Sequence, residues 1–122
     1  MNEWFLYICL YSSRKYIAKI YRRKLAIKPE VATKLSEIDS QYIARIYAMG
    51  EYHGYPVEII PYYANGSLAG KVFSFNQLKY EIIPSVNEGL RILHTNDIIH
   101  KDVKPSNLML NDDGRTVRIN IQ

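Results

Sequence analysis

A short polar loop between two apolar runs carries the residues best suited to chemistry in this chain. Ile98-Ile99 precedes the loop and Leu108-Met109-Leu110 follows it. Between them, Asp102 stands two residues before Lys104 and five before Asn107. Phosphoryl transfer uses such a set, because a carboxylate deprotonates the attacking hydroxyl, a lysine neutralises charge on the phosphoryl group and an amide oxygen holds a metal ion. The spacing therefore predicts a phosphoryl-transfer loop.

The loop resembles the catalytic loop of eukaryotic-type protein kinases, His-Arg-Asp-Leu-Lys-Pro-x-Asn. From His100 this chain reads His-Lys-Asp-Val-Lys-Pro-Ser-Asn. The resemblance implies that Asp102 is the catalytic base, Lys104 the phosphate contact and Asn107 a magnesium ligand, with His100 supporting the loop. The lysine after the aspartate is typical of serine/threonine-directed kinases. A surface loop between two strands is the alternative, and the number of matched positions argues against it.

Two strands are predicted upstream, at residues 4–11 and 15–21, because both runs are rich in aromatic and β-branched residues. The second run resembles the kinase strand that carries the ATP-positioning lysine, which makes Lys19 the nucleotide-binding candidate. An exposed strand lysine is the alternative. No glycine precedes Gly50, so the glycine-rich phosphate loop of the family either lies upstream of Met1 or is missing.

A helix is predicted from Pro29 to about residue 39, since proline suits the first helical turn. In kinases the equivalent helix supplies a glutamate that pairs with the strand lysine. Glu30 is the candidate, although registering Leu35 and Ile43 on the family pattern puts Val31 at that position. A first-turn glutamate favoured by the helix dipole is the alternative.

Further strands are predicted at 42–47 and 57–60, joined through Gly50 to Pro56. A long helix is predicted from Ser74 to about residue 94, with a capping box and a kink at Pro84. The strands and this helix frame the loop that carries the chemistry.

The segment 61–68 between these elements resembles the hinge that joins the two kinase lobes. The resemblance implies that Ile60 lies beside the adenine pocket, that the Pro61 carbonyl accepts a hydrogen bond from adenine and that the Tyr63 N–H donates one. Proline lacks an N–H but keeps its carbonyl, so this acceptor survives. A generic turn before a helix is the alternative.

A turn at residues 111–114 and a strand at 116–121 follow the catalytic loop. In kinases this strand runs into Asp-Phe-Gly, whose aspartate binds magnesium. Counting without a gap puts Asn120 at that place, and aligning the apolar positions of the strand puts Ile121 there. Neither is acidic, and the sequence ends at Gln122. We therefore expect a domain truncated before Asp-Phe-Gly, with phosphotransfer near background.

The composition is that of an ordinary globular chain, with 122 residues, 48% hydrophobic and 23% charged, and a net charge of +4. A single cysteine, Cys9, rules out an internal disulfide and fits a reducing compartment. Seven of the sixteen Lys/Arg residues lie between Arg14 and Lys28. A solvated connection is favoured there over a nucleic-acid patch, because no aromatic-interleaved motif accompanies it. No secretory signal or membrane-length apolar run is present, which predicts a cytoplasmic protein.

The resemblance implies an α+β, protein-kinase-like fold with a small antiparallel-sheet lobe (1–60), a hinge (61–68) and the start of a helical lobe (69–122). The resemblance implies ATP and Mg2+ as cofactors and a protein serine or threonine as substrate. A non-catalytic kinase-like binding module is the alternative. A small-molecule kinase of the aminoglycoside-phosphotransferase type is a third alternative. Those enzymes lack a lysine two residues after the catalytic aspartate, so Lys104 argues against this alternative. Exposed apolar surface predicts self-association.

Overall fold

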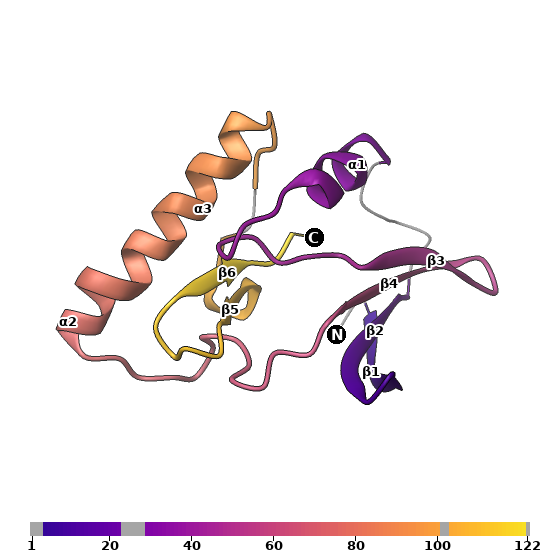
Figure 1. The fold of residues 1–122 in the computed structure, drawn as a ribbon, viewed down its shortest axis with the longest axis horizontal. Helices are drawn as coiled ribbons and strands as arrows, with labels where there is room; N and C mark the ends of the chain where they lie inside the picture. The colour runs from indigo at the N-terminus through magenta and orange to yellow at the C-terminus, as the bar shows by residue number, and fades with distance from the viewer. Residues whose placement is uncertain (1–3, 23–28, 101–102, 122) are drawn as a thin grey trace. The chain divides into compact units, whose positions relative to one another are not determined.

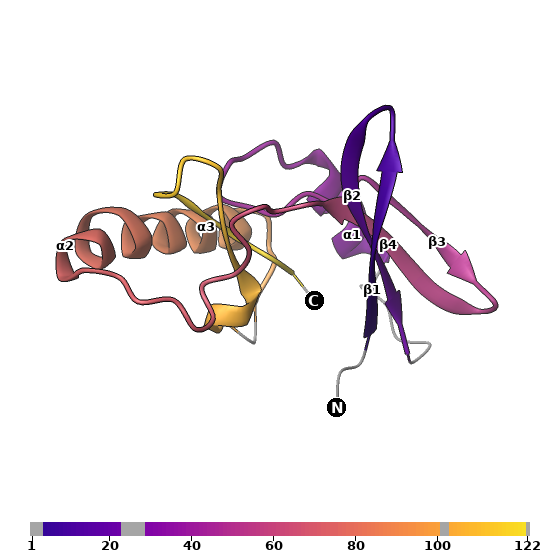
Figure 2. The same ribbon diagram turned by 90° about the horizontal axis from the view of Figure 1, so that it is seen from below.

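The computed structural model describes residues 4–22, 29–100 and 103–121. The chain divides into two compact units, each made of segments distant in sequence (Figures 1 and 2). Among the described residues, the first unit takes in 4–22, 29–37 and 45–62, and the second takes in 38–44, 63–100 and 103–121. Across the described ranges, no helix has the length and apolar character needed to cross a bilayer.

A four-stranded antiparallel sheet forms most of the first unit. Its order is β1 (Trp4–Tyr11), β2 (Arg14–Tyr21), β4 (Tyr55–Pro61) and β3 (Ala48–Tyr52). Helix α1 (Pro29–Glu37) buries Leu35. These elements confirm the predicted strands at 4–11 and 15–21. They also confirm the helix predicted from Pro29 to about residue 39.

The predicted strand at 42–47 is wrong. β3 begins only at Ala48, and its turn lies at residues 53–54 rather than at 50–56. Residues 42–44 instead lie along β6 (Val117–Ile119) in the second unit, where the Ala44 N–H donates to the Ile119 carbonyl at 2.9 Å. The apolar pattern misled because Ile43 and Ala44 are buried within this second unit.

The predicted helix at 74–94 is confirmed as three consecutive segments, α2 (Phe75–Gln77), a π-helical turn η1 (Leu78–Ile82) and α3 (Ile83–Thr95). The capping box of Ser74 and Gln77 is present. The Ile83 N–H donates to the Leu78 carbonyl, five residues back. This wider turn stands just before Pro84, where the sequence predicts a kink.

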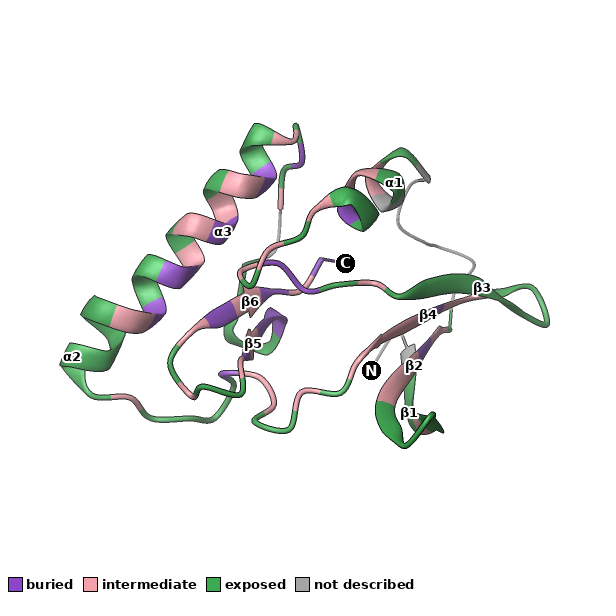
Figure 3. Cartoon of the chain, in the orientation of Figure 1, coloured by how far each residue is buried: buried purple, intermediate pink, exposed green. Residues whose placement is uncertain are grey.

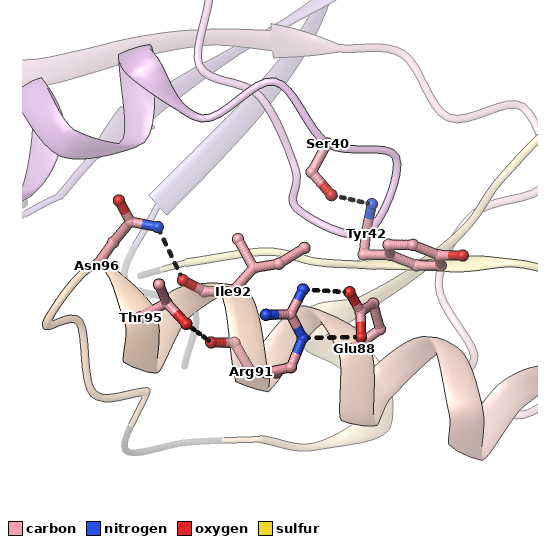
Figure 4. Close-up of polar contacts among 7 residues, drawn as sticks. All are labelled: Ser40, Tyr42, Glu88, Arg91, Ile92, Thr95 and Asn96. Atoms are coloured by element: carbon pink, nitrogen blue, oxygen red, sulfur yellow. Dashed lines mark hydrogen bonds and ion pairs between the residues drawn. The ribbon is translucent and has the colours of Figure 1, made fainter.

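The second unit buries one face of this helix (Figure 3). Ile82 and Leu93 are among its buried residues, with the short strands β5 (Leu108–Leu110) and β6 paired alongside. At the end of α3, the Asn96 side-chain amide donates to the Ile92 carbonyl at 2.8 Å (Figure 4). An exposed Glu88–Arg91 ion pair lies one turn earlier (Figure 4). Helix and strands thus form a core that carries the loop.

Candidate functional site

The catalytic-loop motif forms a tight turn in its described part. Pro105–Asn107 is a 3-10 helix, and the Asn107 N–H donates to the Lys104 carbonyl at 2.9 Å. Proline suits this turn because its φ is already fixed. The Asn107 side chain is only 1% exposed, whereas Lys104 is exposed. Asp102, the predicted base, lies outside the described residues.

Backbone hydrogen bonds tie the segment after the predicted hinge to this loop. The Leu68 N–H donates to the Leu108 carbonyl at 2.9 Å, and the Leu110 N–H donates to the Gly66 carbonyl at the same distance. Residues 66–68 therefore lie along β5, directly after the loop. The Gly-Ser-Leu motif thus has a structural role here, since it anchors the strand that leaves the loop.

Asn120 is the C-terminal residue that the structure brings to the loop. Its N–H donates to the Asn107 carbonyl at 2.8 Å, and its carbonyl lies 3.0 Å from Nε2 of His100. His100 therefore contacts the backbone beside the loop, as its supporting role requires. Ile121, the other residue that the sequence allowed at this position, is buried.

The donor set for Mg2+ can be judged from these side chains. Asn107 carries an amide, and Asn120, whose N–H bonds to its carbonyl, carries an amide rather than a carboxylate. Mg2+ is usually held by one or two carboxylates together with phosphate oxygens and water. Among the described residues, no group of three His, Cys, Asp or Glu side chains is placed to hold a metal. The described residues thus fit Mg2+ only weakly.

Lys19, the predicted nucleotide lysine, lies directly opposite Glu58 in the pairing of β2 with β4. Both residues are only 3% exposed. The hydroxyl of Tyr21 donates to Oε1 of Glu58, and Nζ of Lys19 lies 5.1 Å from the centre of the Tyr21 ring. Glu30, the predicted partner of Lys19, is exposed in the first turn of α1.

Burial dominates the electrostatics of this cluster. It lowers the pKa of Lys19, and the facing Glu58 carboxylate partly opposes that shift. It raises the pKa of Glu58, against the effects of the Tyr21 hydroxyl and the Lys19 ammonium. The pKa of Tyr21 is raised by burial and by the adjacent carboxylate, so its phenol stays protonated and keeps donating. The charges of Lys19 and Glu58 therefore depend on one another.

The predicted hinge residues fall in different units. Ile60 and Pro61 end β4 in the first unit, whereas Tyr63 opens the second. All three are partly buried. Their role around adenine needs both units and stays a prediction.

Sequence reasoning missed Glu58 and Tyr21. The two-residue spacing of Lys19 and Tyr21 signalled that both side chains share one face of a strand. Glu58 belongs to a strand 39 residues further along, and only the pairing of β2 with β4 brings it there. The sequence carried no signal for that register.

Comparisons with known proteins agree on one kind of domain. Residues 12–120 match the protein kinase domain. Serine/threonine-protein kinase 17A of Oryctolagus cuniculus is 23% identical over 84% of this chain and 29% of its own length. Mitogen-activated protein kinase kinase kinase 1 of Homo sapiens is 36% identical over 49% of this chain and 4% of its own length. The chain thus spans less than a third of these relatives.

A solved structure, Rad53 1-466 in complex with AMP-PNP, matches the fold with a TM-score of 0.76 at 16% identity. The match covers 99% of this chain and 35% of that one. It confirms the predicted fold, an antiparallel sheet with a helix followed by the start of a helical unit.

Proposed function

Because the chain belongs to the protein kinase domain family, we propose that it forms part of a domain that transfers the γ-phosphate of ATP to a serine or threonine hydroxyl of a protein. The observation that carries this proposal is the Lys104–Asn107 turn, whose buried asparagine accepts a hydrogen bond from the Asn120 N–H, while the Asn120 carbonyl lies 3.0 Å from Nε2 of His100. Such a turn carries a lysine and an amide oxygen on one loop, which phosphoryl transfer requires.

Each residue of the motif has one task in this proposal. Asp102 accepts the proton of the attacking hydroxyl, and Lys104 neutralises charge on the phosphoryl group. Lys19 contacts the nucleotide phosphates from the sheet, and the backbone at Pro61 and Tyr63 binds adenine. Asn107 would be the loop's ligand to Mg2+, which would supply charge neutralisation on the phosphates.

A non-catalytic kinase-like binding or regulatory module is the second candidate, and the ungapped count that puts Asn120 at the aspartate position favours it. A neutral amide there removes electrostatic stabilisation of the kind that is usually the largest catalytic contribution. We therefore expect phosphotransfer by this 122-residue chain to be near background. Robust autophosphorylation that Asp102→Asn abolishes would contradict this expectation and restore the catalytic reading.

Nucleotide binding is the first test of the proposal. We expect the wild-type chain to bind ATP in the presence of Mg2+, measured by isothermal titration calorimetry, and Lys19→Met to weaken that binding. Lys15→Met is the matched control, because Lys15 lies on the same strand but is exposed. Equal ATP affinity in all three proteins would remove Lys19 from the site, and no binding by the wild type would refute the proposal.

A further inference from the structure

Lys19 has a carboxylate neighbour within its own sheet. We propose that Glu58, held by the Tyr21 hydroxyl, positions Lys19 for the nucleotide phosphates, in the role that the family resemblance assigns to a glutamate of the helix. This inference rests on the proposed function, because it requires Lys19 to be the phosphate-binding lysine. Glu58 and Tyr21 are then positioning residues that act through Lys19.

The strand register gives the first support. Lys19 and Glu58 are direct cross-strand partners in an antiparallel pair, so their side chains leave the same face of the sheet with Cβ atoms about 5 Å apart. β1 pairs on the far side of β2, and β3 pairs on the far side of β4. The two residues therefore lie on the inner strands of the sheet, where the register is held from both sides.

The neighbours in the same row give the second support. The row across the four strands reads Leu6, Lys19, Glu58 and Met49. Leu6 and Met49 on the outer strands are 56% and 44% exposed, whereas Lys19 and Glu58 between them are each only 3% exposed. Two charges buried to this degree are stable only when each is paired and hydrogen-bonded, and removal of one leaves the other uncompensated.

Tyr21 gives the third support. Its hydroxyl donates to the carboxylate that faces Lys19, and its ring lies beside the Lys19 ammonium. The same side chain therefore holds Glu58 in place and limits the positions open to Lys19. An ammonium has three N–H groups, so it can face a carboxylate and a phosphate oxygen at the same time.

The rival carboxylate is less well placed. Glu30 is exposed at the start of α1, and its helix is a separate element from the sheet. A carboxylate within the sheet fixes the lysine whatever position that helix takes. In this chain, the pairing of the lysine is then independent of the helix.

The experiment compares Glu58→Gln, Tyr21→Phe, Glu30→Gln and the matched control Glu51→Gln. Glu51 is an exposed glutamate of β3 in the same sheet. Glutamine keeps the shape of Glu58 and an acceptor for Tyr21, and circular dichroism checks that each variant is folded. Two readouts are made on the whole chain: ATP affinity with Mg2+ by calorimetry, and the pKa of Lys19 from the NMR shift of its ¹³Cε.

We expect Glu58→Gln to weaken ATP binding roughly tenfold, because Lys19 then loses the carboxylate that positions it. The same variant should lower the pKa of Lys19 further, because the opposing carboxylate charge is gone. Tyr21→Phe should have a smaller effect on ATP affinity, since the carboxylate remains but is no longer held. Glu51→Gln should match the wild type in both readouts.

Two results would overturn the inference while the proposed function stands. In the first, Glu58→Gln leaves the ATP affinity and the pKa of Lys19 unchanged although Lys19→Met abolishes binding. In the second, Glu30→Gln weakens ATP binding more than Glu58→Gln does. Failure of the wild-type chain to bind ATP is a different outcome, because it would refute the proposed function as well.

Discussion

At the scale of single residues, Asn120 is the side chain that most alters the loop. Its N–H donates to the carbonyl of the loop residue Asn107, and counting along the motif without a gap puts its amide side chain where the family has an aspartate. An amide differs from a carboxylate there by one negative charge, close to Asn107, the residue that we propose as the metal ligand. Replacement of that one side chain is therefore a direct test of the site.

We expect Asn120→Asp to strengthen Mg2+-dependent ATP binding roughly tenfold, or about 1.4 kcal/mol, since Mg2+ prefers a carboxylate to an amide. The measurement is the ratio of ATP dissociation constants with and without Mg2+. Asn87→Asp, at an exposed position of α3, adds the same charge elsewhere and should leave the ratio unchanged. No gain in Asn120→Asp would argue that Asn120 does not face the metal.

Asp113 stabilises the turn between β5 and β6. Its Oδ1 accepts hydrogen bonds from the N–H groups of Arg115 and Thr116 at 2.8 and 2.9 Å, and Oδ2 accepts one from the Thr116 hydroxyl at 2.9 Å. These bonds lower the pKa of Asp113 from its usual 3.8. Asp112, its neighbour in the turn, has an exposed side chain.

We expect Asp113→Ala to lower the free energy of unfolding by about 1 kcal/mol at pH 7, a value kept small because the site is exposed. Because the pKa of Asp113 is lower in the folded state than in the unfolded state, its carboxylate stabilises the fold at pH values above the unfolded-state pKa. This stabilisation is lost as the pH falls through the folded-state pKa. The difference from wild type should therefore shrink below about pH 4. Urea unfolding at pH 7 and pH 3 measures it. An equal loss in Asp112→Ala would contradict the role of Asp113.

At the scale of the elements, α3 and β6 approach closely at Gly89. A Cβ atom there would lie 2.8 Å from Cδ1 of Ile119 and 2.9 Å from the Tyr42 carbonyl oxygen. The carbonyl is backbone that bonds to β6, so it cannot move alone. Position 89 of the helix therefore requires glycine, because any side chain there would collide with Ile119 and Tyr42.

We expect Gly89→Ala to lower the free energy of unfolding by about 1–2 kcal/mol, because the overpacking cost exceeds the gain in helix propensity. Gly50→Ala is the control, since a Cβ there meets nothing within 4 Å. Thermal and urea unfolding of both variants measure the difference. A more stable Gly89→Ala would mean that the helix shifts away from β6 at no cost.

The elements that the sequence predicts correctly are those with local signals. β1 and β2 follow their aromatic and β-branched runs, and Ser74 and Gln77 mark the start of the long helix. β3 could not be found in this way, because all five of its residues are exposed and show no alternation. Its place depends on pairing with β4, which is a tertiary effect.

The candidate site divides in the same manner. Lys104 and Asn107 were predictable because one short motif holds them. Glu58 was not, because its relation to Lys19 arises from strand pairing. The sequence could not decide between Asn120 and Ile121 either, since a shift by one residue turns a strand side chain to the opposite face.

At the scale of the whole molecule, apolar side chains remain exposed on both units. In the first unit, Ile8 and Leu10 of β1 are 60% and 72% exposed. In the second unit, Val72, which precedes α2, is 97% exposed, and Phe75, the first residue of α2, is 74% exposed. Within the described residues, β1 also ends the order of the sheet. Exposed apolar edge strands promote association between chains.

We expect the chain to self-associate at micromolar concentration, measured as the mass from static light scattering. The double variant Ile8→Thr with Leu10→Thr should shift the mass toward the monomer, because threonine keeps β propensity but removes apolar surface. Val72→Thr, outside the sheet, is the control for loss of one apolar group. A monomeric wild-type chain at this concentration would contradict the prediction.

The π-helical turn η1 connects the number of residues in this helix with the presence of Pro84 just after the turn. A π turn holds one residue more than the α-helix that it interrupts, as a single-residue insertion would produce. Without that residue, Pro84 would stand inside a regular α-helix, where its ring meets the carbonyl four residues before it. The π turn and the proline are thus coupled: in a variant that lacks one residue of Leu78–Ile82, we expect a continuous helix only if Pro84 is also replaced.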